Sequence, residues 1–277
     1  MINTLGVCSW SLRAQGVDAL LQRVAECGVA RVQVALGGLL DRPDDVFKLR
    51  EADENGAIAL CSGMLATIGE DYSSLESIKR TGGLRPDEHW DENLQLAERT
   101  AELASDLELG LVTLHAGFIP EDDARLHEVM VERVCRVAEV FNARGVTLGL
   151  ETGQETAETL LRLLSTIAPR VRVGVNFDPA NMILYGMGDP TQAMRVLREH
   201  IVQVHMKDAL ASETPGEWGT EVVAGAGQVE WDALFEIVEG LAEQIDVVIE
   251  REAGDTRIED IRTAAALARQ QIDRVRA

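Results

Sequence analysis

Short apolar segments alternate with longer segments of helical periodicity from one end of the chain to the other, and no linker of different composition interrupts them. The apolar segments are rich in Val, Ile and Leu rather than strictly alternating, which is typical of parallel strands covered on both faces. We expect strands at residues 3–10, 31–36, 57–63, 110–115, 146–151, 173–178, 201–206 and 246–250.

Between these segments, apolar residues recur at helical spacing, as in Val17, Leu20, Leu21 and Val24. Helices are expected around residues 17–24, 44–55, 91–107, 130–141, 156–167, 190–199, 231–241 and 261–275. Eight strands alternating with eight helices predict an α/β fold, a single (β/α)8 TIM barrel with one domain at residues 1–277. A doubly wound open sheet is the competing fold, but its G-x-G-x-x-G signal after the first strand is absent.

Two connections are longer than the rest, at residues 64–90 and 207–230. Both follow a predicted strand, so both would lie on the C-terminal face of the barrel, where active sites of this fold are found. Long loops at that face are candidates for lids over a site. The alternative is that they are disordered insertions.

The composition excludes several classes of protein. Hydrophobic residues make up 46% of the chain, which is enough for a large core. No apolar run approaches the roughly 18 residues that a membrane helix needs. Residues 1–5 lack the pattern of a secretory signal, so we expect a cytoplasmic protein. The net charge of −21 opposes binding to nucleic acid, because it would repel the phosphates.

Four successive predicted strands carry an ionisable residue at or near their end, namely Glu151, Asp178, His205 and Glu250. In a closed barrel these residues would converge on one point. Each also has an ordinary interpretation. Asp178 precedes Pro179 and could cap a helix; His205 could be a core histidine. Glu250 could join Arg251 and Glu252 in a surface ion cluster, and Glu151 could be a plain strand-end carboxylate.

Taken together, the four residues are hard to explain without a ligand. Three carboxylates within several ångströms repel one another in a partly buried site, so they need a cation or raised pKa values. Two Glu, one Asp and one His offer hard oxygen donors and one nitrogen. This set suits Mn²⁺ best, with Mg²⁺, Co²⁺, Fe²⁺ and Zn²⁺ as alternatives.

The quartet, in this order, resembles the metal-binding residues of the sugar phosphate isomerase/epimerase family. That family is a branch of the xylose isomerase-like TIM barrels, related to the ketose 3-epimerases and to endonuclease IV. Supporting stretches are GVCSW at residues 6–10, His205-x-Lys207-Asp208, and Gly225-x-Gly227 followed by Trp231. The resemblance covers essentially the whole chain. It implies one divalent ion held by the quartet and a small carbohydrate-like substrate bound through its carbonyl and adjacent hydroxyl.

The resemblance further implies that Glu151 and Glu250 move protons on opposite faces of the substrate. The expected function is an isomerase or epimerase that shifts a proton alpha to a carbonyl of a sugar, keto-acid or keto-polyol through a metal-bound enediolate. One alternative is a dehydratase of an inosose- or dehydroshikimate-like substrate on the same site. Another is a catalytically silent sugar-binding barrel. A homo-oligomer is compatible with the sequence.

Four more residues are predicted to bind substrate, namely His115, Asn181, Lys207 and Trp10. His115 closes the fourth predicted strand. In the related endonuclease IV a histidine there joins a three-metal cluster, but the further histidines of that cluster are missing, and Asn181 stands where one is needed. A phosphodiester hydrolase is therefore disfavoured. Lys207 could instead pair with Asp208, Asn181 could be a helix-start residue, and Trp10 could be core.

Overall fold

The computed structural model describes residues 2–277, and the side chains from residue 5 onward. Eight parallel strands close into a barrel in the order β1-β10-β7-β6-β5-β4-β3-β2. Their bounds are β1 Ile2–Cys8, β2 Arg31–Ala35, β3 Ala59–Met64, β4 Leu111–Leu114, β5 Thr147–Glu151, β6 Val173–Phe177, β7 Ile201–Met206 and β10 Ile245–Ile249. The predicted (β/α)8 barrel is confirmed.

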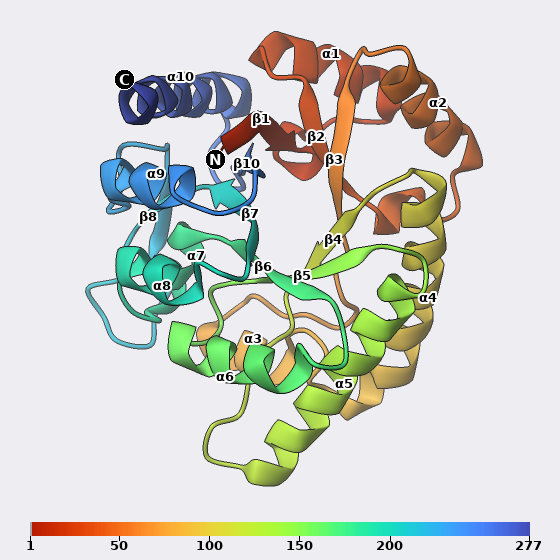
Figure 1. Ribbon diagram of the computed structural model, residues 1–277, viewed down its shortest axis with the longest axis vertical. Helices are drawn as coiled ribbons and strands as arrows, with labels where there is room; N and C mark the ends of the chain where they lie inside the picture. The colour runs from red at the N-terminus through yellow and green to blue at the C-terminus, as the bar shows by residue number, and fades with distance from the viewer. Residues whose placement is uncertain (1) are drawn as a thin grey trace.

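Helices surround the strands as an outer layer (Figure 1). They are α1 Val17–Cys27, α2 Pro43–Glu54, α3 Leu75–Thr81, α4 Trp90–Asp106, α5 Ala124–Asn142, α6 Ala157–Ile167, α7 Pro179–Tyr185, α8 Pro190–Leu197, α9 Trp231–Glu239 and α10 Arg257–Arg276. The first helix packs against the last, which closes the layer. Among the described residues, no helix combines the length and the apolar character needed to cross a bilayer.

Side-chain caps begin several of these helices. Ser74, Asp123, Thr156, Asp178 and Asp189 each accept a hydrogen bond from the backbone N–H three residues later. Such a cap satisfies one of the free N–H groups of the first turn and stabilises a helix by about 1 kcal/mol. Proline follows two of the caps at the first helical position, where its missing N–H costs nothing.

The structure also contains short elements that the sequence patterns do not predict. Helix α3 and the 3-10 helix η3 (Asp87–His89) lie within the connection at residues 64–90. Helix α7 follows β6 directly, and β8 (Asp208–Leu210) pairs with β9 (Thr220–Val222) as an antiparallel hairpin within residues 207–230. The expected first strand is too long, because β1 ends at Cys8 and Trp10 lies in the 3-10 helix η1 (Ser9–Leu12).

Candidate metal centre

The four predicted ligands converge at the carboxyl ends of β5, β6, β7 and β10. Glu151, Asp178, His205 and Glu250 each offer an atom within 4.8 Å of the others. Nδ1 of His205 lies 3.3 Å from Glu151 Oε1, 3.7 Å from Asp178 Oδ2 and 3.4 Å from Glu250 Oε2. All four residues are buried. Sequence positions that are far apart thus meet at one point because the barrel is closed.

Two atoms of this cluster have no hydrogen-bond partner among the described residues, although both are buried. They are Nδ1 of His205 and Oδ2 of Asp178. An unpaired polar atom in a buried site costs free energy unless something binds it. Three carboxylate oxygens and one imidazole nitrogen are donors that suit a divalent cation, so the residues fit the metal that the sequence predicts.

The negative charges of the cluster are offset only in part by the protein itself, because three carboxylates face one histidine and one lysine. Burial raises the pKa of Asp178 to about 6, although the nearby ammonium of Lys207 opposes this shift. Burial also acts against ionised Glu250, but Lys207 and His205 outweigh it and hold the pKa of Glu250 well below its usual range. Glu151, together with Glu250 and Asp178, holds the pKa of His205 well above its usual value, against the effect of burial.

The two glutamates are held by different kinds of donor. Glu151 accepts hydrogen bonds from the side-chain amides of Asn181 at 3.0 Å and Asn176 at 3.1 Å. Glu250 accepts from Trp10 Nε1 at 2.7 Å and from Lys207 Nζ at 2.9 Å. Glu151 therefore meets neutral donors, whereas Glu250 forms a buried ion pair.

Asp178 combines the two roles that its sequence context suggests. Its Oδ1 accepts from the backbone N–H of Asn181 at 2.9 Å and so caps α7. Its Oδ2 makes no hydrogen bond to the described residues and lies 3.7 Å from Nδ1 of His205 and 4.0 Å from Nζ of Lys207. Asn181 comes close to the cluster because Gly153, with a φ of 139°, lets the β5–α6 loop approach α7. A Cβ atom on Gly153 would lie 2.5 Å from Cβ of Asn181.

The His205-x-Lys207-Asp208 motif divides into two functions. Lys207 donates to Asn181, Glu250 and Glu252 and is 3% exposed. Asp208 does not pair with it. Its carboxylate accepts from the backbone N–H groups of Ala209, Gly225, Gly227 and Val229 and from Nε1 of Trp231. The Gly225-x-Gly227 stretch is therefore a loop wrapped around Asp208.

His115 and Trp10 border the cluster. His115 Nε2 lies 3.5 Å from Glu151 Oε1, and its side chain is 15% exposed. The ring of Trp10 lies 6.3 Å from the ring of His205, centre to centre. His115 is thus next to a proposed ligand, while Trp10, Asn181 and Lys207 are hydrogen-bonded to the proposed ligands. Their predicted contacts with substrate remain predictions.

A layer of buried amides under the quartet was not expected from the sequence. Gln33, Asn176 and Gln203 are at most 1% exposed. Gln203 Nε2 donates to Gln33 at 3.1 Å and to Asn176 at 3.2 Å, and Ser62 donates to Gln203 at 2.6 Å. The strand register pairs Glu151 with Asn176 and so brings this layer against the site.

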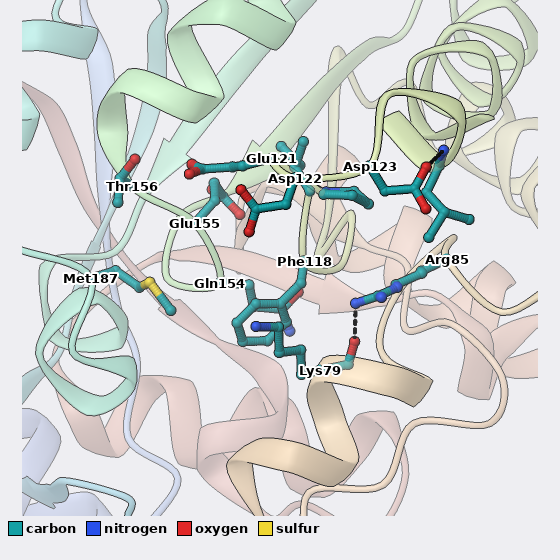
Figure 2. Close-up of a pocket in the computed structure, with 13 residues that line it drawn as sticks. Lys79, Arg85, Phe118, Glu121, Asp122, Asp123, Gln154, Glu155, Thr156 and Met187 are labelled. Atoms are coloured by element: carbon teal, nitrogen blue, oxygen red, sulfur yellow. Dashed lines mark hydrogen bonds between the residues drawn. The ribbon is translucent and has the colours of Figure 1, made fainter. Parts of the chain in front are cut away.

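A cavity of about 350 Å³ is lined by the segments that follow β3, β4 and β5 and by Met187 after α7, and none of the four residues lines it. Figure 2 shows Glu121, Asp122 and Glu155 on one side of it and Lys79, Phe118 and Arg85 on the other. Phe118 and Gln154 separate it from Tyr185, whose ring lies 5.8 Å from that of Phe118 and whose hydroxyl accepts from Gln154 at 3.4 Å.

Glu155 is a buried acid in the wall of this cavity, and burial raises its pKa from 4.5 to about 8. Between these values the folded protein keeps a proton that the unfolded chain has lost, so stability falls as the pH rises through this window. We expect Glu155→Gln to raise the free energy of unfolding at pH 8 by on the order of a few kcal/mol, and with it the melting temperature. Near pH 4.5 the substitution should have little effect.

Melting curves across this pH range would check this prediction. Glu158→Gln is the matched control, because Glu158 is exposed on α6 and should leave the pH dependence of the parent unchanged. Parallel stability profiles for the parent and Glu155→Gln would show that Glu155 is ionised in the folded protein at neutral pH.

Comparison with known proteins agrees with the barrel fold. The sequence profile of the xylose isomerase-like TIM barrel family matches residues 21–276. The uncharacterized protein YihM of Escherichia coli is 29% identical over 122 residues, which cover 43% of this chain and only 37% of that protein. The chain therefore matches less than half of the length of this curated relative.

Solved structures share the whole fold. A xylose isomerase domain protein from Planctomyces limnophilus is 27% identical, with a TM-score of 0.86 over 98% of this chain and 96% of that one. An L-ribulose 3-epimerase is 18% identical, with a TM-score of 0.74 over 100% and 96% of the two chains. A xylose isomerase-like TIM barrel protein from Mycobacterium smegmatis, in complex with magnesium, is 15% identical, with a TM-score of 0.72 over 98% and 97%.

The profile match extends over most of the chain, and the barrel with its cluster of strand-end residues agrees with it. The resemblance seen in the sequence is thereby confirmed: the chain belongs to the xylose isomerase-like TIM barrel family.

Proposed function

We propose that this protein is a divalent-metal-dependent isomerase or epimerase acting on a small polyhydroxylated carbonyl compound. The observation that carries the proposal is the convergence of Glu151, Asp178, His205 and Glu250 within 4.8 Å, with two possible ligand atoms that make no hydrogen bond to the described residues. The magnesium complex of a structural relative supports the choice of a divalent cation. Mn²⁺ is the ion that we favour for this donor set.

When bound, the cation would polarise the substrate carbonyl and offset the negative charge that develops on it. The chain's own contribution is proton transfer. Glu151 on β5 and Glu250 after β10 come from strands separated by β6 and β7 in the barrel, so they approach the substrate from different sides. One carboxylate would remove the proton next to the carbonyl, and the other would return it to the neighbouring carbon or the opposite face.

Aromatic side chains from the two long connections meet, which supports a site that these connections can enclose. Tyr72 comes from the connection at residues 64–90 and Trp218 from the one at residues 207–230, and their rings lie 6.5 Å apart. Trp218 also packs edge-on against Tyr185 of α7 at 4.8 Å. We propose that these loops close over the substrate and exclude water, with His115 as the first polar contact inside.

Removal of the metal tests the proposal directly. Because a cation that binds only the folded state stabilises it, chelation should lower the melting temperature, and Mn²⁺ or Co²⁺ should restore it together with activity. Calorimetry before and after treatment with a chelator, with metal analysis of each sample, gives the answer. Full activity and an unchanged melting curve in excess chelator would reject a metal centre.

The reaction class is best tested by proton NMR in D2O with a panel of ketoses, keto-acids and keto-polyols. An isomerase or epimerase should exchange the proton alpha to the carbonyl, even where net conversion is slow. Loss of water from the substrate after that exchange would identify the dehydratase alternative. Binding without exchange in the metal-loaded protein would identify a silent sugar-binding barrel.

A further inference from the structure

We infer that Gln33 is a positioning residue for the metal centre: its side-chain oxygen places the proton of His205 on Nε2 and leaves Nδ1 free to bind the cation. That a cation binds here rests on the proposed function, whereas the effect of Gln33 on the position of the histidine proton does not. Both side chains are fully buried inside the barrel.

The contact between the two residues is short and directional. Oε1 of Gln33 lies 2.7 Å from Nε2 of His205. An amide oxygen can only accept, so the proton must sit on the histidine nitrogen. The Gln33 amide cannot turn over without loss, because its nitrogen donates to Thr113 Oγ1 at 2.9 Å and its oxygen also accepts from Gln203 at 3.1 Å.

A second neighbour favours the opposite arrangement. Nδ2 of Asn176 lies 3.0 Å from the same histidine nitrogen and 3.1 Å from Glu151 Oε2. An amide nitrogen can only donate, so Asn176 would stabilise a lone pair on Nε2 and hence a proton on Nδ1. The orientation of Asn176 is fixed as well, because its oxygen accepts from Gln203 at 3.2 Å.

The quartet needs the arrangement that Gln33 favours. A neutral imidazole carries one proton, so Nδ1 has a lone pair only when the proton is on Nε2. Nδ1 lies 3.3–3.7 Å from one oxygen of each of the three carboxylates of the quartet, which favour a proton on Nδ1 when no cation is bound. A cation can bind there only if that proton is absent, so Gln33 has to work against both Asn176 and the carboxylates. Gln33 thus decides whether the ring offers a ligand atom or an N–H group to the cation.

Removing this acceptor should therefore weaken metal binding more than the loss of one hydrogen bond suggests. In Gln33→Met the length and burial of the side chain are kept, but only Asn176 and the carboxylates around Nδ1 are left to set the tautomer, and both favour a proton on Nδ1. We expect the Mn²⁺ dissociation constant to rise about 10–100-fold, the range typical of lost partners of metal-binding histidines. Gln33→Glu keeps an oxygen acceptor and should recover much of the affinity.

Ser62→Ala is the matched control for the structural effect of the change. Ser62 is fully buried and donates to Gln203 at 2.6 Å in the same layer, but it reaches His205 only through Gln203 and Gln33, and Gln203 keeps its bonds to Gln33 and Asn176 without it. Its loss should lower the melting temperature, yet leave the Mn²⁺ affinity close to that of the parent. Equal affinity losses in both variants would show that Gln33 acts only through the general stability of the layer, and would overturn the inference.

The tautomer itself can be read by NMR of protein with ¹⁵N-labelled histidine, with His205→Ala to assign the signal. We expect a proton on Nε2 in the Mg²⁺-loaded parent. In the metal-free proteins, at a pH where the ring is neutral, the parent should hold a larger share of the Nε2–H form than Gln33→Met, because the carboxylates around Nδ1 favour Nδ1–H in both. Equal shares in the two proteins would overturn the inference. A parent that binds no metal but shows this difference would support Gln33's role and refute the proposed metal centre.

Discussion

Glu151→Gln and Glu250→Gln are each expected to reduce turnover by about 10²–10⁴-fold, the loss typical of removing a general base. Glutamine keeps the size of the side chain and one oxygen that can bind a cation, but it cannot take up a proton at neutral pH. Both variants should therefore retain metal while losing proton transfer. Metal content and steady-state rates, measured on the same preparations, would check this result.

The two variants should also differ from each other if each glutamate serves one face of the substrate. One should still exchange the alpha proton of a given substrate with D2O, while the other exchanges only the product or the opposite epimer. A one-base isomerase or a dehydratase would instead give one inactive variant and one weakened variant. Wild-type turnover in both, with metal bound, would exclude proton transfer by these residues.

Lys207→Met should strongly destabilise the metal-free protein. Lys207 and Glu250 form a buried ion pair at 2.9 Å. Removing one partner of such a pair leaves an uncompensated buried charge, which costs about 3–5 kcal/mol. Because a divalent cation can supply the lost positive charge, Mn²⁺ should raise the melting temperature of this variant by more than it raises that of the parent. Calorimetry with and without Mn²⁺ measures both effects.

Lys48→Met provides the control for removing a lysine in general. Lys48 pairs with Asp18 at 2.6 Å, but both side chains are largely exposed, so little change is expected. If Lys207→Met melts like Lys48→Met, or if Mn²⁺ stabilises it no more than the parent, then Lys207 does not balance the charge of the quartet.

The sequence predicts the barrel and the quartet because both depend on regular features. Strands and helices alternate along the whole chain, and each ligand stands at or next to a strand end, where the closed sheet brings distant positions together. The short elements α3, α7 and the β8–β9 hairpin were missed, since they hold too few residues to show a periodic pattern.

The partners of the quartet were harder to predict, because they depend on contacts across the barrel. Nothing local to Lys207 indicates that it pairs with Glu250 rather than Asp208. The amide layer, however, leaves a signal. Asn176 stands two residues before Asp178, and Gln203 two before His205, so each shares a strand face with a ligand. A polar residue two positions below a predicted ligand is therefore worth testing in other chains.

The amide layer sets a limit on how this protein could be engineered. TIM barrels usually fill their interior with branched apolar side chains. Replacing a satisfied buried polar network by apolar residues of similar volume is often neutral or stabilising. A design procedure that scores stability alone would thus favour aliphatic residues at Gln33, Asn176 and Gln203. By the geometry above, it would yield a robust barrel whose histidine and glutamate no longer keep the orientation that a cation needs.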